Sequence, residues 1–156
     1  MAIREIVQHT DNFIRMKSRA VKYIDEKIIE LLDDMKETVL KANGSGLAAV
    51  QVGVLKRVFV ININGMYIEF INPKILETSG EQEQIEGCLS VKQPYGFVKR
   101  PESVTISALD REGNEFVLTC SGYTAIAVCH ENDHLDGIIY TDKLVRFATR
   151  EEMNKV

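Results

Sequence analysis

The segment from Cys129 to Gly137 constrains the fold most, because it contains the pattern H-E-x-x-H. This pattern places His130 and His134 four residues apart, so that in a helix both imidazoles lie on one face. Two such histidines can hold one metal ion, and the carboxylate of Glu131 then lies within reach of a water on that ion. The segment therefore predicts a metal-binding helix.

The residues before the histidines support this helix. Tyr123, Ile126 and Ala127 recur with them at helical spacing and predict a buried stripe that the histidines continue. Ser121 is a candidate N-cap, and Gly137 is a candidate for the left-handed residue that ends the helix. One alternative stays open at this point: two inward-facing histidines can be hydrogen-bonded core residues without a metal.

Length, charge and cysteine content set the class of protein. The chain has 156 residues, enough to bury a proper core, and we expect residues 1–156 to form a single domain. The net charge of −4 argues against direct nucleic-acid binding, which favours a basic face. No apolar run approaches membrane-spanning length, and charges interrupt the N-terminus where a signal peptide needs an apolar core. Three widely spaced cysteines form no disulfide framework, so we expect a cytoplasmic protein without membrane contact.

The first part of the chain predicts an arm followed by a helix. Residues 1–23 show no clear periodicity and predict an irregular arm, in which His9 is a surface histidine and not a ligand. From Asp25, a candidate N-cap, apolar residues recur at helical spacing. Asn43-Gly44 then ends the helix, which we interpret as scaffold.

Three hairpins are predicted beyond this helix. The first joins Arg57–Ile63 to Met66–Ile71 through Asn64-Gly65, the second joins Lys74–Thr78 to Glu81–Ile85 through Ser79-Gly80, and the third joins 104–108 to 116–118 through Asp110–Asn114. The third leads into the histidine helix, and residues 141–156 predict a charged, mostly exposed tail. The fold class is therefore α+β, with antiparallel strands and hairpins packed around a central H-E-x-x-H helix, plus an N-terminal helix.

A catalytic site with two histidines needs a third protein ligand and an open position for water. Cys88 is the first candidate, since it lies in the tight segment E-G-C-L-S between strand-like runs. Cys120 and Cys129 are interpreted as small buried hydrophobic residues. Residue chemistry alone leaves the third ligand open among Cys, Asp, Glu and His.

The run from Gly44 to Gln51 has little side-chain bulk, with two glycines and two alanines. Its backbone can therefore approach another group closely, while Gln51 offers both a donor and an acceptor. The run lacks the spacing and the lysine of a phosphate-binding loop.

Three motifs occur in a fixed order: G-x-G-L-A-A-x-Q at 44–51, E-G-C-L-S at 86–90 and H-E-x-D-H-L-x-G at 130–137. Together they resemble the three motifs of the peptide deformylase family, and the resemblance spans nearly the whole chain. It implies a metal-dependent hydrolase of the cytoplasm. Its substrates are then the formyl-methionyl N-termini of nascent polypeptides near the ribosome, from which it removes the N-formyl group and releases formate.

The same resemblance implies the role of each site residue. The ligands of one divalent metal are Cys88, His130 and His134. The metal is Fe²⁺ in most family members, with Zn²⁺, Ni²⁺ or Co²⁺ as substitutes in isolated protein. Glu131 is the general acid and base, and the groups that hold the formyl oxygen are Gln51 and the backbone N–H of Leu89. The substrate-binding residues are Gly44, Ser45 and Gly46, which pair with the substrate backbone, and Ile126, which lines the methionine pocket.

The chain also departs from the family pattern. Val50 and Lys92 stand where the family usually has Pro, Cys129 where it has Gln, and Tyr95 where Arg is common. By the resemblance, these departures concern substrate affinity and loop rigidity and not the chemistry, because they remove no ligand, base or oxygen-binding group.

Two other functions are consistent with parts of the pattern. A zincin-type endoprotease shares H-E-x-x-H, but it favours a third His or Glu ligand and leaves Cys88 and Gln51 without a role. A protein that only binds formylated N-termini is the second alternative, and the presence of Glu131 counts against it.

Overall fold

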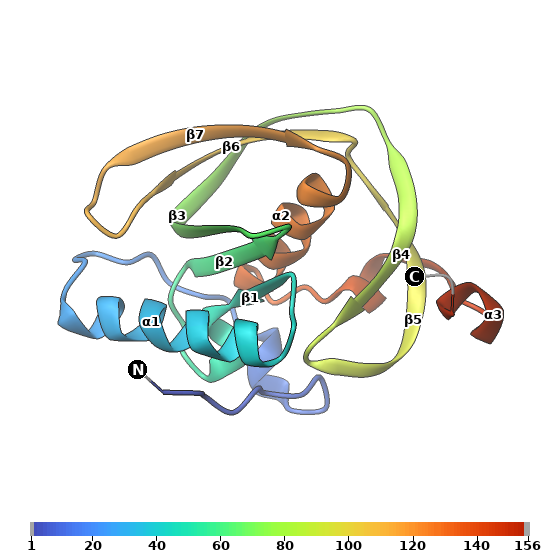
Figure 1. Ribbon diagram of the computed structural model, residues 1–156, viewed down its shortest axis with the longest axis horizontal. Coiled ribbons are helices and arrows are strands. Elements are labelled where there is room, and N and C mark those ends of the chain that lie inside the picture. Colours follow the sequence, from blue (N-terminus) through green and yellow to red (C-terminus); the bar gives the residue numbers. More distant parts are fainter. Residues whose placement is uncertain (1, 155–156) are drawn as a thin grey trace.

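The computed structural model describes residues 2–154, and within them all side chains except those of residues 92–94, so that the side chain of Lys92 lies outside the described part. The helices are α1 (Glu26–Lys41), α2 (Gly122–Leu135) and α3 (Arg150–Met153), with 3₁₀ turns at Asn12–Arg15, Ala49–Val52 and Tyr140–Lys143. The strands are β1 (Gly46–Ala48), β2 (Val58–Ile63), β3 (Met66–Ser79), β4 (Gln82–Cys88), β5 (Val91–Arg100), β6 (Ser103–Leu109), β7 (Glu115–Ser121) and β8 (Leu144–Phe147). Figure 1 shows their arrangement, which confirms the α+β class.

The larger sheet has five antiparallel strands in the order β1-β2-β3-β6-β7 and lies between α1 and α2. Its strand β2 shows the layering, because Val58 and Val60 pack in the cluster with α1. The alternate residues Phe59 and Ile61 pack in the cluster with α2. Since both faces of β2 are covered, the strand has a continuous apolar sequence and not an alternating one.

Helix α1 forms as the sequence predicts. The Asp25 carboxylate accepts a 3.0 Å hydrogen bond from the backbone N–H of Ile28, and Asn43 takes a left-handed φ of 56° just beyond the helix. The apolar stripe, with Leu32 and Met35 fully buried, packs on the sheet. Burial of each such side chain contributes about 1.5–3 kcal/mol, which makes α1 a scaffold helix.

Helix α2 is buried over most of its surface. Ala125 and Val128 pack in the same core cluster as Phe59 and Phe70 of the sheet. The predicted helix end is confirmed, since Gly137 has a φ of 75°. Ser121 occupies the N-cap position without a side-chain cap hydrogen bond.

The prediction of a buried stripe is wrong at Tyr123. This side chain is 56% exposed in the first turn of α2, and its hydroxyl lies 2.6 Å from Ser45 Oγ.

Two of the three predicted hairpins are confirmed. β2 and β3 pair around Asn64-Gly65, where both residues have positive φ, as the tightest two-residue turns require. β6 and β7 pair around the Asp110–Asn114 turn. The β6–β7 hairpin carries the alternation of apolar and polar residues that the sequence shows, whereas β2 is apolar over most of its length.

The predicted hairpin around Ser79-Gly80 is wrong. β3 continues to Ser79 and pairs there with β6, whereas β4 pairs with β5 in a second, three-stranded sheet of order β4-β5-β8. Gly80, with a φ of 68°, therefore turns the chain from one sheet into the other. A turn signal predicts a change of direction, but it does not determine which strand the chain pairs with next.

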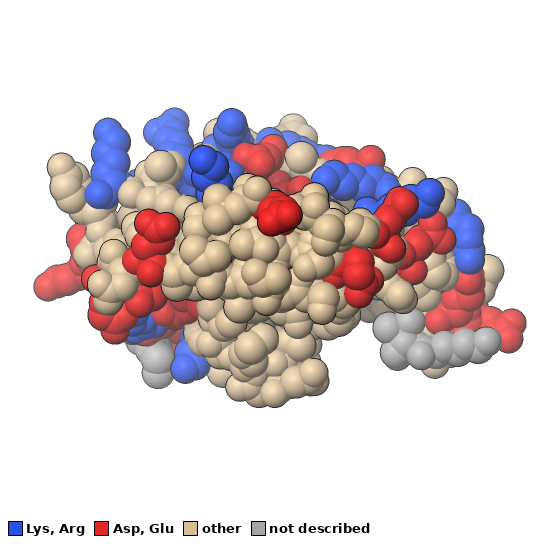
Figure 2. Space-filling view, turned by 90° about the horizontal axis from the view of Figure 1, so that it is seen from above, with Lys and Arg blue, Asp and Glu red and all other residues tan. Residues whose placement is uncertain are grey.

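The surface and the carboxyl end complete the fold. Seen from above, over β6 and β7, the centre of the surface is mainly uncharged and charged side chains gather toward its edges (Figure 2). The tail forms the short strand β8 and the four-residue helix α3. No helix of the described chain is both long and apolar enough to cross a membrane.

Candidate metal centre

The end of β4 and one face of α2 bring three metal-ligating side chains together. Ligand atoms of Cys88, His130 and His134 all lie within 4.8 Å of one another. The Cys88 Sγ is 3.3 Å from Nε2 of His134, and both histidines are buried. Among residues 2–154, the His, Cys, Asp or Glu side chains that lie close enough together to hold a metal ion are those of these three residues.

The donor set fits a divalent transition metal. A thiolate and two imidazoles are ligand types that Fe²⁺ and Zn²⁺ accept. Burial lowers the pKa of His134 well below its usual value, so this ring is neutral and able to coordinate. Its Nδ1 is buried and has no hydrogen-bond partner among the described residues. A purely hydrogen-bonded core histidine therefore explains His134 less well than a metal ligand.

A buried ion pair orients the second histidine. The Nδ1–H of His130 donates a 2.8 Å hydrogen bond to Oε1 of Glu86. Arg100 donates to both oxygens of the same carboxylate, at 2.8 and 2.9 Å. Burial alone would raise the pKa of Glu86, but the hydrogen bonds from Arg100 and His130 hold it below its usual value. With the proton on Nδ1, the Nε2 lone pair of His130 is free for a metal.

The ion pair continues toward the surface. Arg100 also donates a 2.6 Å hydrogen bond to Asp133, and the Lys143 ammonium lies 3.0 Å from the same Asp133 oxygen. Arg100 and Glu86 are almost fully buried, so each charge needs its partner. Arg100 was not predicted as part of the site. The sequence offers only a weak signal for it, since Arg100 ends β5 on the same side of the strand as the apolar Val98, two residues before it.

Glu131 lies beside the cluster of Cys88, His130 and His134 and is not part of it. Its Oε2 is 3.9 Å from Nε2 of His130, and its Oε1 is buried without a hydrogen-bond partner in the described part of the chain. Burial raises the pKa of Glu131 to about 7, so the group can take and give a proton near neutrality. A Cβ at Gly46 would lie 2.8 Å from Oε2 of Glu131, which explains the glycine there.

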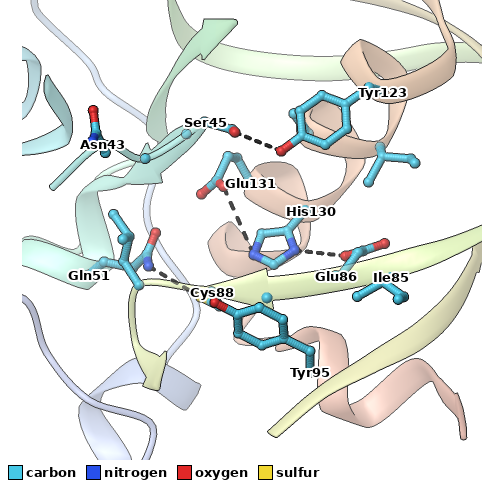
Figure 3. Close-up of a pocket in the computed structure, with 16 residues that line it drawn as sticks. Asn43, Ser45, Gln51, Ile85, Glu86, Cys88, Tyr95, Tyr123, His130 and Glu131 are labelled. Carbon is cyan, nitrogen blue, oxygen red and sulfur yellow. Dashed lines mark hydrogen bonds and ion pairs between the residues drawn. The ribbon is translucent and has the colours of Figure 1, made fainter. Parts of the chain in front are cut away.

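Gln51 is held in one orientation beside Cys88. Its Oε1 accepts a 2.9 Å hydrogen bond from the backbone N–H of Ala48, and its Nε2 donates to Ser90 Oγ at 3.0 Å. The same Nε2 is 3.5 Å from Cys88 Sγ. Leu89 follows Cys88 in the turn between β4 and β5. The first and second motifs thus meet at the cluster, as Figure 3 shows for Gln51 and Cys88.

The N-terminal arm forms backbone hydrogen bonds with both of these motifs. The Val7 backbone N–H donates to the Gln51 carbonyl at 2.7 Å, and the His9 N–H donates to the Ser90 carbonyl at 2.8 Å. His9 is exposed and is not among the ligands, as predicted. This structural role of the arm could not be predicted from the sequence, because backbone hydrogen bonds leave no side-chain pattern to recognise.

A cavity of about 300 Å³ opens onto the cluster. Its walls come from β1 and the residues just before it, from β4, from β5 and from α2. The residues that line it are Asn43, Gly44, Ser45, Gly46, Gln51, Ile85, Glu86, Gly87, Cys88, Leu89, Tyr95, Tyr123, Ile126, Ala127, His130 and Glu131. Strand β1 is an edge strand, which among residues 2–154 pairs with β2 alone. The structure thus brings every residue predicted for the site to one cavity, except His134, which lies behind it in the cluster.

The two other cysteines lie outside the cluster. Cys129 is buried in the core between α2 and the sheet, and burial raises the pKa of its thiol to about 11. Burial also raises the pKa of the half-buried Cys120. Both thiols are therefore protonated and act as small apolar side chains; the prediction of burial is confirmed for Cys129, whereas Cys120 is only partly buried.

The chain matches a known family and known structures. The family model for polypeptide deformylase matches residues 3–150. A peptide deformylase of Caldicellulosiruptor bescii is 50% identical over 99% of this chain and 93% of its own length. One of Acetivibrio thermocellus is 52% identical over 99% of this chain and 91% of its own length.

A solved structure agrees with the sequence matches. The crystal structure of a peptide deformylase from Legionella pneumophila superposes with a TM-score of 0.89 at 39% identity, covering 99% of this chain and 95% of that one. Family, sequence and fold thus agree over nearly the full length. The chain belongs to the peptide deformylase family, the hydrolases that remove the N-formyl group from the N-terminal formyl-methionine of newly made polypeptides and release formate.

Proposed function

We propose that the cluster beside the cavity is the reaction centre, with Cys88, His130 and His134 as ligands of one divalent metal, Fe²⁺ in the cell. The observation that carries this proposal is the convergence of three ligand atoms within 4.8 Å, next to Glu131, whose Oε1 is buried without a hydrogen-bond partner in the described part of the chain. A bound metal supplies a Lewis acid and lowers the pKa of water. Zn²⁺, Ni²⁺ or Co²⁺ substitute for iron in isolated protein.

Glu131 moves the protons of the reaction. Its carboxylate accepts a proton from the attacking water and later gives it to the departing amine. Two features support this role: Oε1 has no other partner among the described residues, and the pKa of about 7 suits both transfers. Because Gly46 leaves room beside Oε2, the carboxylate keeps this position.

Gln51 and the backbone N–H of Leu89 hold the formyl oxygen as negative charge develops on it. Each such donor typically contributes about 2.7–4 kcal/mol to transition-state stabilisation. The bonds from Ala48 to Gln51 and from Gln51 to Ser90 fix the amide beforehand, so that little reorganisation is needed during the reaction.

The substrate backbone lies along the free edge of β1. Gly44, Ser45 and Gly46 line the cavity there, and an edge strand offers unpaired N–H and C=O groups to an extended peptide. Ile126 lines the same cavity and packs against the methionine side chain. The narrow apolar slot suits an unbranched side chain and a formyl group as the smallest acyl substituent.

In the cell, the chain acts as a single cytoplasmic domain, 1–156, on formyl-methionyl N-termini emerging near the ribosome, without direct nucleic-acid binding. The net charge of −4 and the lack of a membrane-spanning helix in the described chain support this proposal.

The test is formate release from a formyl-Met peptide by protein loaded with iron without oxygen. We expect stoichiometric formate and a free methionyl N-terminus. Cleavage of an internal bond in an acetylated peptide would favour an endoprotease instead. Peptide binding without formate release under Fe²⁺, Ni²⁺ and Co²⁺ would favour a protein that only binds formylated N-termini.

A further inference from the structure

Two hydroxyl groups meet across the rim of the cavity. Ser45 Oγ and Tyr123 OH are 2.6 Å apart, although Ser45 precedes β1 and Tyr123 lies in the first turn of α2. Figure 3 shows this hydrogen bond beside Glu131, joining the two sides of the site. It therefore connects the edge that faces the substrate to the helix that carries the ligands.

A second hollow of about 750 Å³ adjoins the cavity. Its lining includes residues of β4, of β5 and of the first turns of α2. Ile85, Tyr123 and Ile126 line both spaces and form the wall between them. The volume open to a substrate beside Ile126 thus depends on where the Tyr123 ring stands.

Tyr123 is the part of this wall that is freest to move. Its side chain is 56% exposed, whereas Ile126 is 5% exposed and fixed by packing. A rotation of the Tyr123 side chain toward the second hollow would enlarge the cavity, and the hydrogen bond to Ser45 opposes that rotation. A tyrosine side chain has only two χ angles. Because the hydrogen bond holds the ring at its hydroxyl end, this one bond suffices to select the position of the ring.

We propose that the Ser45–Tyr123 hydrogen bond sets the width of the side-chain pocket and so excludes bulky first side chains, such as that of phenylalanine, while it admits methionine. This inference rests on the proposed function, since it requires the first side chain of the substrate to lie beside Ile126. It makes Tyr123 a specificity-determining residue that acts through the pocket wall.

Tyr123→Phe tests the proposal, because it keeps the ring and removes the hydroxyl. The measured quantity is the ratio of kcat/KM for a formyl-Met peptide to kcat/KM for the matching formyl-Phe peptide. We expect this ratio to fall about 3- to 10-fold, the range that corresponds to one neutral hydrogen bond. Tyr23→Phe is the matched control, since Tyr23 is exposed and lines neither space, and its ratio should equal that of the wild type.

The double variant shows whether the bond itself is responsible. Ser45→Ala should shift the ratio in the same direction, and Ser45→Ala/Tyr123→Phe should shift it no further, because both changes remove one interaction. An unchanged ratio in an active Tyr123→Phe protein would overturn the inference alone. So would an equal loss for both peptides, which would place the hydroxyl on the substrate backbone. A wild type that releases no formate would overturn the proposed function as well.

Discussion

The carboxylate of Glu86 accepts a 2.8 Å hydrogen bond from Nδ1 of His130, and it does so deep in the protein, where Arg100 saturates both of its oxygens. This contact determines which ring nitrogen carries the proton and which one is free for a metal. The Glu86–Arg100 ion pair therefore orients the His130 ring without belonging to the three-residue cluster itself.

Glu86→Gln should weaken metal binding, since glutamine keeps the size of the side chain but loses the charge that fixes the His130 ring. We expect affinity for Zn²⁺ or Co²⁺ to fall about 10- to 100-fold, the usual effect of removing such a support. A chelator-competition titration measures the metal affinity of each variant. Glu83→Gln, an exposed change on the same strand, is the control, and equal affinities of the two variants would contradict the role of Glu86.

Arg100→Met should destabilise the fold, because it leaves the Glu86 carboxylate buried without its cation. Breaking a buried pair from one side typically costs about 3–5 kcal/mol in the free energy of unfolding. Urea denaturation of the metal-free protein measures this cost. Arg146→Met removes an exposed arginine that pairs with Glu152 and should change stability little, so similar losses in both variants would contradict the account.

The Glu86 ion pair also predicts how stability depends on pH. The hydrogen bonds from Arg100 and His130 hold the pKa of Glu86 below its usual value, although burial opposes them. A carboxylate with a lowered pKa stabilises the folded state above its unfolded-state pKa and loses that contribution as the pH falls through its folded-state pKa. In urea denaturation, the stability difference between wild type and Glu86→Gln should therefore shrink from pH 6 toward pH 3, to about zero once both states bind the proton. A difference that grows on acidification would refute this assignment.

Cys88→Ser should abolish metal retention, whereas Cys120→Ser should leave it unchanged. The Cys88 sulfur belongs to the three-ligand cluster, and the Cys120 thiol lies on β7 away from it. Metal content after gel filtration measures both variants. Equal metal in the two proteins would remove Cys88 from the site. Iron-loaded wild type should also lose activity in air faster than nickel-loaded protein, because a thiolate on ferrous iron is open to oxidation.

Local patterns predicted the parts of the fold that local interactions determine. The α2 segment, the Gly137 helix end and the Asn64-Gly65 hairpin depend on neighbours in sequence, and the structure has all three. The family and its reaction followed from three ordered motifs and are confirmed by the family model and the relatives. The roles of individual residues stay predictions, although the structure brings these residues together.

The features that sequence analysis missed depend on contacts between distant segments. Arg100 meets Glu86 only because β4 and β5 pair, and the turn at Gly80 joins two sheets that no local pattern distinguishes. Tyr123 fits a helical stripe by spacing, but it is exposed in the first turn of α2. Helical periodicity predicts which face of a helix a residue occupies, but it does not predict whether the rest of the protein covers that face at every turn.

The central claim is that Glu131 moves protons beside a metal held by three other residues. Glu131→Gln keeps nearly the same shape and removes the basic oxygen, so the variant should fold, retain its metal and bind formyl-Met peptide as the wild type does.

Formate release by metal-loaded Glu131→Gln is the most direct test of this claim. We predict that kcat falls at least about 10²-fold while peptide affinity changes little, since proton transfer belongs to the transition state. A variant that keeps its metal and releases formate at the wild-type rate would contradict the claim, as would a variant that loses the metal, because Glu131 would then be a ligand.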